Sequence, residues 1–149
     1  MIFDLIPDSD PRLHSRVPDF DFDNPPTDPV GLYADMLESM RHHHGAGLAA
    51  NQCGLPYRCF VAYDENSLPF IAFNPEIKLE QGDQTDAEGC LSFPGTVLTV
   101  SRSMWVHFIY QNENGDKKVF SFHGFRARAA LHEIDHLNGV VFTERANAA

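Results

Sequence analysis

The chain has 149 residues and carries 11 Lys and Arg residues against 21 Asp and Glu residues, so its formal charge is −10 at pH 7. This length fits a single domain, residues 1–149, with its own hydrophobic core. The acidity argues against nucleic-acid binding and against docking on an anionic membrane. The sequence has no apolar run of about 20 residues and no secretory signal pattern, so we expect a cytoplasmic protein.

The first segment, residues 2–26, is rich in Pro and Asp, and we expect an irregular arm or a short strand there. A helix is predicted next. Thr27 or Asp28 can cap its free N–H groups, and Pro29 suits its first turn. We expect the helix to end at Gly45. Its apolar stripe at i, i+3, i+4 and i+7 consists of Tyr33, Met36, Leu37 and Met40.

After residue 57 the sequence changes to short runs of β-branched and aromatic residues, which are typical of strands. The predicted strands are 59–63, 70–73, 97–100, 105–110 and 119–122. Asn114 and Gly115 predict a hairpin turn between the last two. Residues 126–137 predict a second helix, which Asn138 and Gly139 end. A helix, several antiparallel strands and another helix indicate the α+β class.

The strongest chemical signal lies on the second predicted helix, where His132, Glu133 and His136 form an H-E-x-x-H pattern. Residues i and i+4 share one helix face, so both imidazoles can reach one metal ion. Glu133 is offset by one residue, near the metal without being a ligand. A metal ion that activates water and a carboxylate that takes its proton indicate metal-assisted hydrolysis. Chance placement of these three residues on a helix is the alternative.

Two histidines leave a catalytic metal one ligand short, because open sites use three protein ligands and water. Beyond His136 the only acidic residue is Glu144, on what reads as a short tail. We therefore expect the third ligand upstream, with Cys90 as the candidate in a loop between predicted strands. Cys53 remains a competitor. Cys59 lies inside an apolar strand and is expected in the core.

A glycine-rich stretch, residues 45–52, follows the first helix and ends in Gln52. Small residues let the backbone approach a ligand closely, and the Gln52 amide can donate to an oxyanion. The stretch lacks the Lys and the spacing of a phosphate-binding loop, which argues against nucleotide binding. Taken alone, it reads as a structural loop.

Three motifs together resemble those of one family. Residues 45–52 (GAGLAANQ), 88–92 (EGCLS) and 132–136 (HEIDH) look like the three signature motifs of the peptide deformylases, in the same order and at similar separations. Residues 7–8, 11–13 and 137–139 also fit, so the resemblance covers nearly the whole chain. It implies antiparallel sheets packed around the central H-E-x-x-H helix. It also implies removal of the N-formyl group from formyl-methionyl nascent peptides, with release of formate.

The resemblance assigns a role to each residue of these motifs. Cys90, His132 and His136 would bind one divalent metal ion, with water in the fourth position. The family's metal is typically Fe(II), with Ni, Co or Zn able to occupy the site. Glu133 would take a proton from water and pass it to the leaving amine. The developing oxyanion would be held by the Gln52 side chain and the Leu91 backbone N–H.

The resemblance also implies how the substrate binds. The backbones of Gly47 and Gly89 would pair with the peptide as an added strand. An apolar pocket for the methionine side chain would have Ala46, Arg128 and Ala129 in its wall. The partners are formylmethionyl nascent peptides, and we expect a monomer.

Several remaining polar residues admit two interpretations. Glu88 and Asp135 could orient a ligand imidazole or the cysteine loop, or could be ordinary solvated carboxylates. Arg102 could pair with either one. Residues 42–44, three histidines, do not share a helix face, so a solvated run or a pocket rim is favoured over a second metal site. His107, in a strand, is expected to be structural.

The chain departs from the family near its C-terminal end. Bacterial deformylases commonly continue into a further helix, whereas residues 140–149 read as a short tail. The resemblance therefore indicates a short form without a helix for ribosome docking, suited to a phage (and then to the host cytoplasm), a bacterial paralogue or an organelle. Two other functions remain open: an endopeptidase that does not depend on Cys90, and an inactive metal-stabilised binding module in which Glu133 is dispensable.

Overall fold

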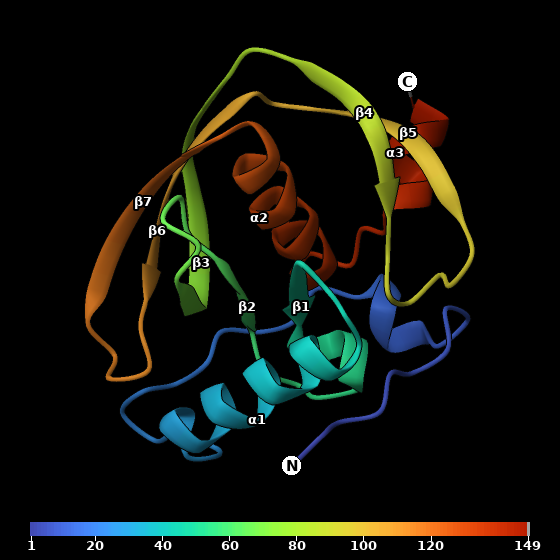
Figure 1. Ribbon diagram of the computed structural model, residues 1–149. Helices are drawn as coiled ribbons and strands as arrows, with labels where there is room; N and C mark the ends of the chain where they lie inside the picture. Colours follow the sequence, from blue (N-terminus) through green and yellow to red (C-terminus); the bar gives the residue numbers. More distant parts are fainter. Residues whose placement is uncertain (149) are drawn as a thin grey trace.

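A central helix organises the fold: α2 (Gly124–Leu137) runs between a large antiparallel sheet and a small one (Figure 1). The structure is a computed structural model and describes residues 1–148. The other helices are α1 (Pro29–His42), α3 (Phe142–Ala148) and two 3₁₀ helices, Pro11–His14 and Ala50–Cys53. The strands are β1 (Gly47–Ala49), β2 (Cys59–Tyr63), β3 (Pro69–Gln81), β4 (Gln84–Gly89), β5 (Val97–Arg102), β6 (Trp105–Gln111) and β7 (Lys117–His123).

The large sheet has the strand order β1-β2-β3-β6-β7, and β4 pairs with β5 in the small sheet. Every one of these pairs is antiparallel. This arrangement confirms the predicted α+β class with antiparallel sheets around the H-E-x-x-H helix. It also leaves β1 as an edge strand of the large sheet, with β2 on one side only.

Strand β2 is covered on both faces, which explains its continuous apolar sequence. Alternate side chains of a strand point to opposite faces. Phe60 and Ala62 therefore pack in the cluster that contains the buried face of α2, whereas Cys59 and Val61 pack in the cluster of α1. Because one face of β2 packs against α2, the helix lies in the interior, where residues 127–137 are all buried.

Helix α1 begins where the sequence predicts and ends earlier. The Asp28 carboxylate accepts hydrogen bonds from the N–H groups of Val30 and Gly31, both at 3.2 Å. The helix ends at His42 instead of Gly45 because His44 takes the left-handed conformation, with φ 59°. The Gly45 N–H then donates to the Met40 carbonyl at 3.0 Å, which closes the last turn.

The five predicted strands are all present, and two further strands were missed. β1 is a run of small residues in the glycine-rich stretch, and β4 (QTDAEG) is polar and mostly exposed. Neither carries the β-branched pattern that marks a strand in sequence. β3 continues to Gln81, well past the predicted 70–73, with irregular pairing after Phe73. The N-terminal arm contains a 3₁₀ helix and no strand among residues 2–26.

The region after α2 corrects the expectation of a tail without a helix. Phe142–Ala148 form α3, which lies beside β5 (Figure 1). Two contacts with the rest of the molecule stabilise this short segment. Phe142 is buried, and Arg145 forms an ion pair with Asp135 of α2. Within residues 1–148, no helix has the length and apolar character to cross a membrane.

Candidate metal centre and active site

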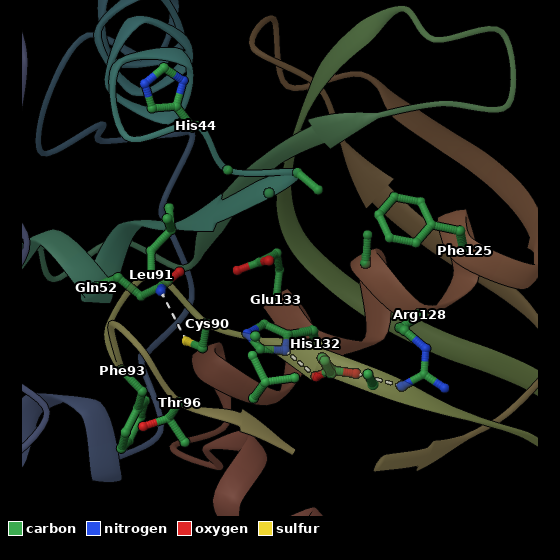
Figure 2. A pocket seen from close by; sticks show the side chains of 18 of the residues that line it. His44, Gln52, Cys90, Leu91, Phe93, Thr96, Phe125, Arg128, His132 and Glu133 are labelled. Atoms are coloured by element: carbon green, nitrogen blue, oxygen red, sulfur yellow. Dashed lines mark hydrogen bonds and ion pairs between the residues drawn. The ribbon is translucent and has the colours of Figure 1, made fainter. Parts of the chain in front are cut away.

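Three donor side chains, one from a loop and two from α2, meet at one point. Figure 2 shows two of them, Cys90 and His132. Cys90 follows the end of β4, in the loop before β5, while His132 and His136 lie one turn apart on α2. Cys90 Sγ is 3.3 Å from His136 Nε2, and the two Nε2 atoms are 3.1 Å apart. The structure thus brings together the three residues that the family resemblance assigns to the metal.

The donor set fits a divalent metal ion. Tetrahedral bonds of about 2.0–2.1 Å to nitrogen and 2.3 Å to sulfur place two nitrogen donors about 3.3 Å apart, and nitrogen and sulfur about 3.5 Å apart. The observed separations of 3.1 and 3.3 Å lie close to these values. One thiolate and two imidazoles suit Zn(II) and the neighbouring transition metals.

Glu88 fixes which ring nitrogen of His132 faces the donors. Its Oε1 is hydrogen-bonded to His132 Nδ1, so Nε2 is left to face the cluster. Such a carboxylate partner is typical of metal-binding histidines. Burial lowers the pKa of His132, but the negative charge of Glu133 and hydrogen bonds with Cys90 and Glu88 outweigh it and raise this pKa to about 10.

Two arginines hold Glu88 in turn. Arg102 donates from Nε and Nη2 to both carboxylate oxygens, at 2.8 and 2.7 Å, and from Nη1 to Asp135 at 2.9 Å. Arg128 Nη1 donates to Glu88 Oε2 at 2.7 Å. Burial disfavours the charged carboxylate, but Arg102 and His132 outweigh it and lower the pKa of Glu88 below its usual range. Arg102 thus pairs with both carboxylates that the sequence singled out.

The second donor histidine, His136, has a different environment. Burial lowers the pKa of His136 well below its usual value, and the charge of His132 adds to this effect. Asn51 was not predicted as a site residue, yet its Nδ2 donates to the His136 carbonyl at 2.7 Å and so ties α2 to the glycine-rich stretch. Its position beside Gln52 was the only signal in the sequence.

Glu133 lines the same cavity as Cys90 and His132 (Figure 2). It is 4% exposed, and its Oε1 has no hydrogen-bond partner among residues 1–148. Burial raises its pKa to about 7, although the charge of His132 opposes this. A buried carboxylate with a free oxygen and a pKa near neutrality can accept and return a proton.

The Gln52 amide is held in one orientation. Its Oε1 accepts from the Ala49 N–H at 2.9 Å, so its Nε2 faces the cluster. Nε2 donates to Ser92 Oγ at 3.0 Å and lies 3.7 Å from Cys90 Sγ. Leu91, the next residue after Cys90, lines the same cavity. Ser92 was missed because a serine in a loop carries no distinct pattern.

A cavity of about 410 Å³ opens beside the donors. All five residues that the resemblance assigns to the peptide line it: Ala46, Gly47, Gly89, Arg128 and Ala129. The Arg128 charge is paired with Glu88, so the guanidinium is not free within the cavity. Phe125, not predicted as a site residue, also lines the cavity and is 60% exposed (Figure 2).

Several candidates lie outside the donor cluster. Cys59 is fully buried with its Sγ 3.7 Å from Met36 Sδ, which confirms its place in the core. Cys53 does not join the donor cluster either, although it remained a competitor in the sequence. Of residues 42–44, His44 lines the cavity and His43 bonds to the Phe3 carbonyl.

Comparisons with known proteins agree with this geometry. A family model described as polypeptide deformylase matches residues 2–149. A peptide deformylase of Desulforudis audaxviator is 36% identical over 146 residues, covering 97% of this chain and 94% of its own. The peptide deformylase structure from Thermus thermophilus has a TM-score of 0.91 at 36% identity, covering 97% of this chain and 85% of that one. The Met-Ala-Ser-bound class I type b peptide deformylase from Acinetobacter baumannii has a TM-score of 0.89 at 26% identity, covering 97% of this chain and 98% of that one.

The chain belongs to the polypeptide deformylases, metal-dependent hydrolases that remove the N-formyl group from newly made peptides.

Proposed function

We propose a division of labour among the residues of this deformylase. Cys90, His132 and His136 hold the metal ion. Glu133 transfers the proton. The side-chain N–H of Gln52 and the backbone N–H of Leu91 hold the oxyanion. The observation that carries this proposal is the buried Glu133 carboxylate, with an unpartnered oxygen, in the same cavity as two of the three donors, Cys90 and His132.

Deformylation is hydrolysis of an amide: water adds to the formyl carbon, the C–N bond breaks, and formate and a free amino group leave. When bound, a divalent metal ion supplies Lewis acidity that lowers the pKa of water. Glu133 accepts the proton that the water loses and gives it to the nitrogen of the leaving amine. Its raised pKa, about 7, suits both transfers near neutral pH.

The proposed oxyanion donors do not need to reorganise. Because the Ala49 N–H holds Gln52 Oε1, the amide cannot flip without losing that buried hydrogen bond. Its N–H groups therefore stay directed at Ser92 and Cys90, beside which the formyl oxygen would lie. The Leu91 backbone N–H is the second proposed donor. Donors fixed in advance are the most effective form of oxyanion stabilisation.

The peptide is proposed to bind as an extended strand. β1 is an edge strand, and residues of β1 and β4 line the cavity. The backbones of Gly47 and Gly89 can then pair with the peptide whatever its sequence. Ala46, Ala129 and the aliphatic part of Arg128 form the proposed wall for the methionine side chain. The Met-Ala-Ser bound by the Acinetobacter baumannii relative is the product peptide that we propose for this chain.

We propose Fe(II) as the metal used in the cell, since the resemblance to the family implies it. The donor set also accepts Zn, Ni or Co. Protein purified without oxygen should contain iron, and its activity should decay in air and return with Ni(II) or Co(II). Purified protein that contains only zinc and is fully active would contradict the Fe(II) assignment alone.

The decisive experiment measures formate release from formyl-Met-Ala-Ser together with metal content. Glu133→Gln keeps the shape of the side chain and removes its base. We expect kcat to fall by about 10²- to 10⁴-fold, with the metal retained. Glu76→Gln, an exposed carboxylate on β3, is the control and should match wild type. Full activity of Glu133→Gln would refute the proposed proton transfer.

The same assay separates the alternatives. An endopeptidase would cleave internal peptide bonds and would keep metal and activity in Cys90→Ser. A binding module would release no formate even as wild type. We expect full formate release by wild type and by the Glu76→Gln control, loss of metal and of activity in Cys90→Ser, and no internal cleavage by any of these proteins.

We also propose that residues 1–149 act as one catalytic domain and as a monomer. All the proposed catalytic and binding residues come from a single chain. The charge of −10 opposes attraction to ribosomal RNA, so we propose that the enzyme meets nascent peptides without electrostatic docking on RNA. Sedimentation equilibrium should give a mass near 16.7 kDa; a dimer mass at assay concentrations would contradict the monomer.

A further inference from the structure

Helix α3 holds the last turn of α2 through a bidentate ion pair. Arg145 donates from Nε to Asp135 Oδ2 at 2.9 Å and from Nη2 to Oδ1 at 2.8 Å. Asp135 is buried and lies between His132 and His136 in the sequence, whereas the Arg145 side chain is half exposed. Two parallel hydrogen bonds fix the carboxylate in direction as well as position.

From Asp135 the hydrogen bonds continue to the metal centre. Arg102 Nη1 donates to Asp135, and its other nitrogens donate to both oxygens of Glu88. Glu88 is hydrogen-bonded to His132 Nδ1. An unbroken series of charged groups therefore joins α3 to a proposed metal ligand, in the order Arg145, Asp135, Arg102, Glu88, His132.

Arg102 is shared between two carboxylates, so its orientation depends on both. If Asp135 lost Arg145, its Oδ1 would lose the donor Arg145 Nη2, the one donor that it has among the side chains of residues 1–146. Asp135 could then turn toward water, and Glu88 alone would determine the orientation of the Arg102 guanidinium. The direction of the Glu88 oxygen that meets His132 Nδ1 would become less defined.

The start of α3 touches the same ligand independently. The Phe142 ring lies 5.9 Å from the His132 ring and 5.4 Å from that of Phe93, in the loop after Cys90. Phe142 is 1% exposed, so it keeps α3 docked when a side chain further along the helix is changed. A substitution at the half-exposed Arg145 should therefore leave the fold intact.

We propose that Arg145 is a positioning residue for the metal centre, acting on the ring orientation of His132 through Asp135, Arg102 and Glu88. The proposal rests on the assignment of His132 as a metal ligand. Arg145 does not line the substrate cavity, so its effect should appear in metal affinity and kcat, and not in KM.

The test compares Arg145→Gln, Arg145→Lys and the control Glu144→Gln, a neighbouring exposed residue of α3. Each protein is titrated with Co(II) alone, and the thiolate-to-Co(II) absorption band and the dissociation constant are recorded. Partners of metal ligands change affinity or activity by about 10- to 100-fold. Because Arg145 acts at a greater distance, we expect about 3- to 10-fold weaker Co(II) binding for Arg145→Gln, with a shifted band. The Co(II) affinity of Arg145→Lys should lie between those of wild type and Arg145→Gln, and Glu144→Gln should match wild type in affinity and band.

An unchanged Co(II) affinity and band in Arg145→Gln would overturn the proposal and leave an ordinary surface ion pair. A lower melting temperature with an unchanged band would overturn it equally, because it would show a structural role only. Failure of the proposed ligand set looks different: wild type would then give the same thiolate band as Cys90→Ser, or none.

Discussion

Gly47 leaves no room for a side chain beside the carboxylate of Glu133. A methyl group at Gly47 would be 2.6 Å from Oε2 and 2.9 Å from Cγ. Real methyl carbons do not approach other atoms so closely, so any side chain here must displace Glu133. The second glycine of the GAG segment is thus required by the proposed base on α2, through a contact between β1 and α2.

We predict that Gly47→Ala folds normally and loses activity. The atoms in conflict belong to the end of a side chain, so Glu133 can move at small cost in stability. A displacement near 1 Å at a catalytic group costs about 10²-fold in rate. We expect kcat for formate release to fall by about that factor, with the melting temperature and Co(II) band retained.

Gly89→Ala is the matched comparison. A methyl group there meets nothing closer than the Thr96 carbonyl, at 3.9 Å. Its effect should fall on KM, through the proposed pairing with the peptide, while kcat stays near wild type. Equal kcat values for Gly47→Ala and wild type would show that Glu133 is not held by this contact.

The sequence predicted those parts of the fold that depend on local pattern. The stripe of α1 and the alternation of β6 are visible because each element buries one regularly spaced face, and β2 is visible as a continuous apolar run because it is buried on both faces. β4 was missed because its residues are polar and only Glu88 is buried. Its strand conformation depends on pairing with β5, a tertiary effect. α3 was missed for a similar reason: seven residues do not form a stable helix unless they are docked, here by Phe142 and Arg145.

The site was predictable where chemistry demands particular residue types and spacing. H-E-x-x-H places His132 and His136 on one face, and the need for a third ligand made Cys90 the candidate; the resemblance then favoured Cys90 over Cys53. The contacts that arrange the site were not predictable: Arg102 reaches Glu88 and Asp135 across 14 and 33 residues of sequence. No local pattern encodes contacts between residues so far apart in the sequence. From the sequence, Arg102 could pair with either carboxylate; in the structure it pairs with both.

We predict a loss of stability at alkaline pH that depends on Tyr110. Burial raises its pKa from 10.0 to about 12, with added effects of Glu113 and Asp64. Between these values the unfolded chain has lost the phenolic proton and the folded chain has kept it, so stability falls as pH rises. Urea unfolding at pH 8, 10 and 11 should show a steeper fall for wild type than for Tyr110→Phe. Parallel falls would contradict this.

Metal should control which thiol reacts. Cys90 is partly exposed in the cavity, whereas Cys59 is fully buried. Burial raises the pKa of Cys53 to about 12, which leaves about 10⁻⁴ of it as thiolate at pH 8. We expect iodoacetamide to modify Cys90 alone after chelation, and no thiol in metal-loaded protein. Mass spectrometry of the digested protein identifies the site; labelling of Cys90 at the same rate with metal bound would argue against its role as a ligand.

Glu88 should stabilise the fold and the metal centre by separable contacts. Glu88→Ala leaves the buried Arg128 without its ionic partner and removes one of the two carboxylates of Arg102. Removing one partner of a buried ion pair costs about 3–5 kcal/mol, and we expect a loss of that size in urea unfolding. Adding Arg128→Met removes the unpaired charge of Arg128 and should restore part of the stability.

Co(II) affinity should stay weak in the double variant, because His132 Nδ1 still lacks its acceptor. Strictly additive stability losses would show that Arg128 and Glu88 are not coupled; recovery of metal affinity together with stability would show that the carboxylate serves the fold alone.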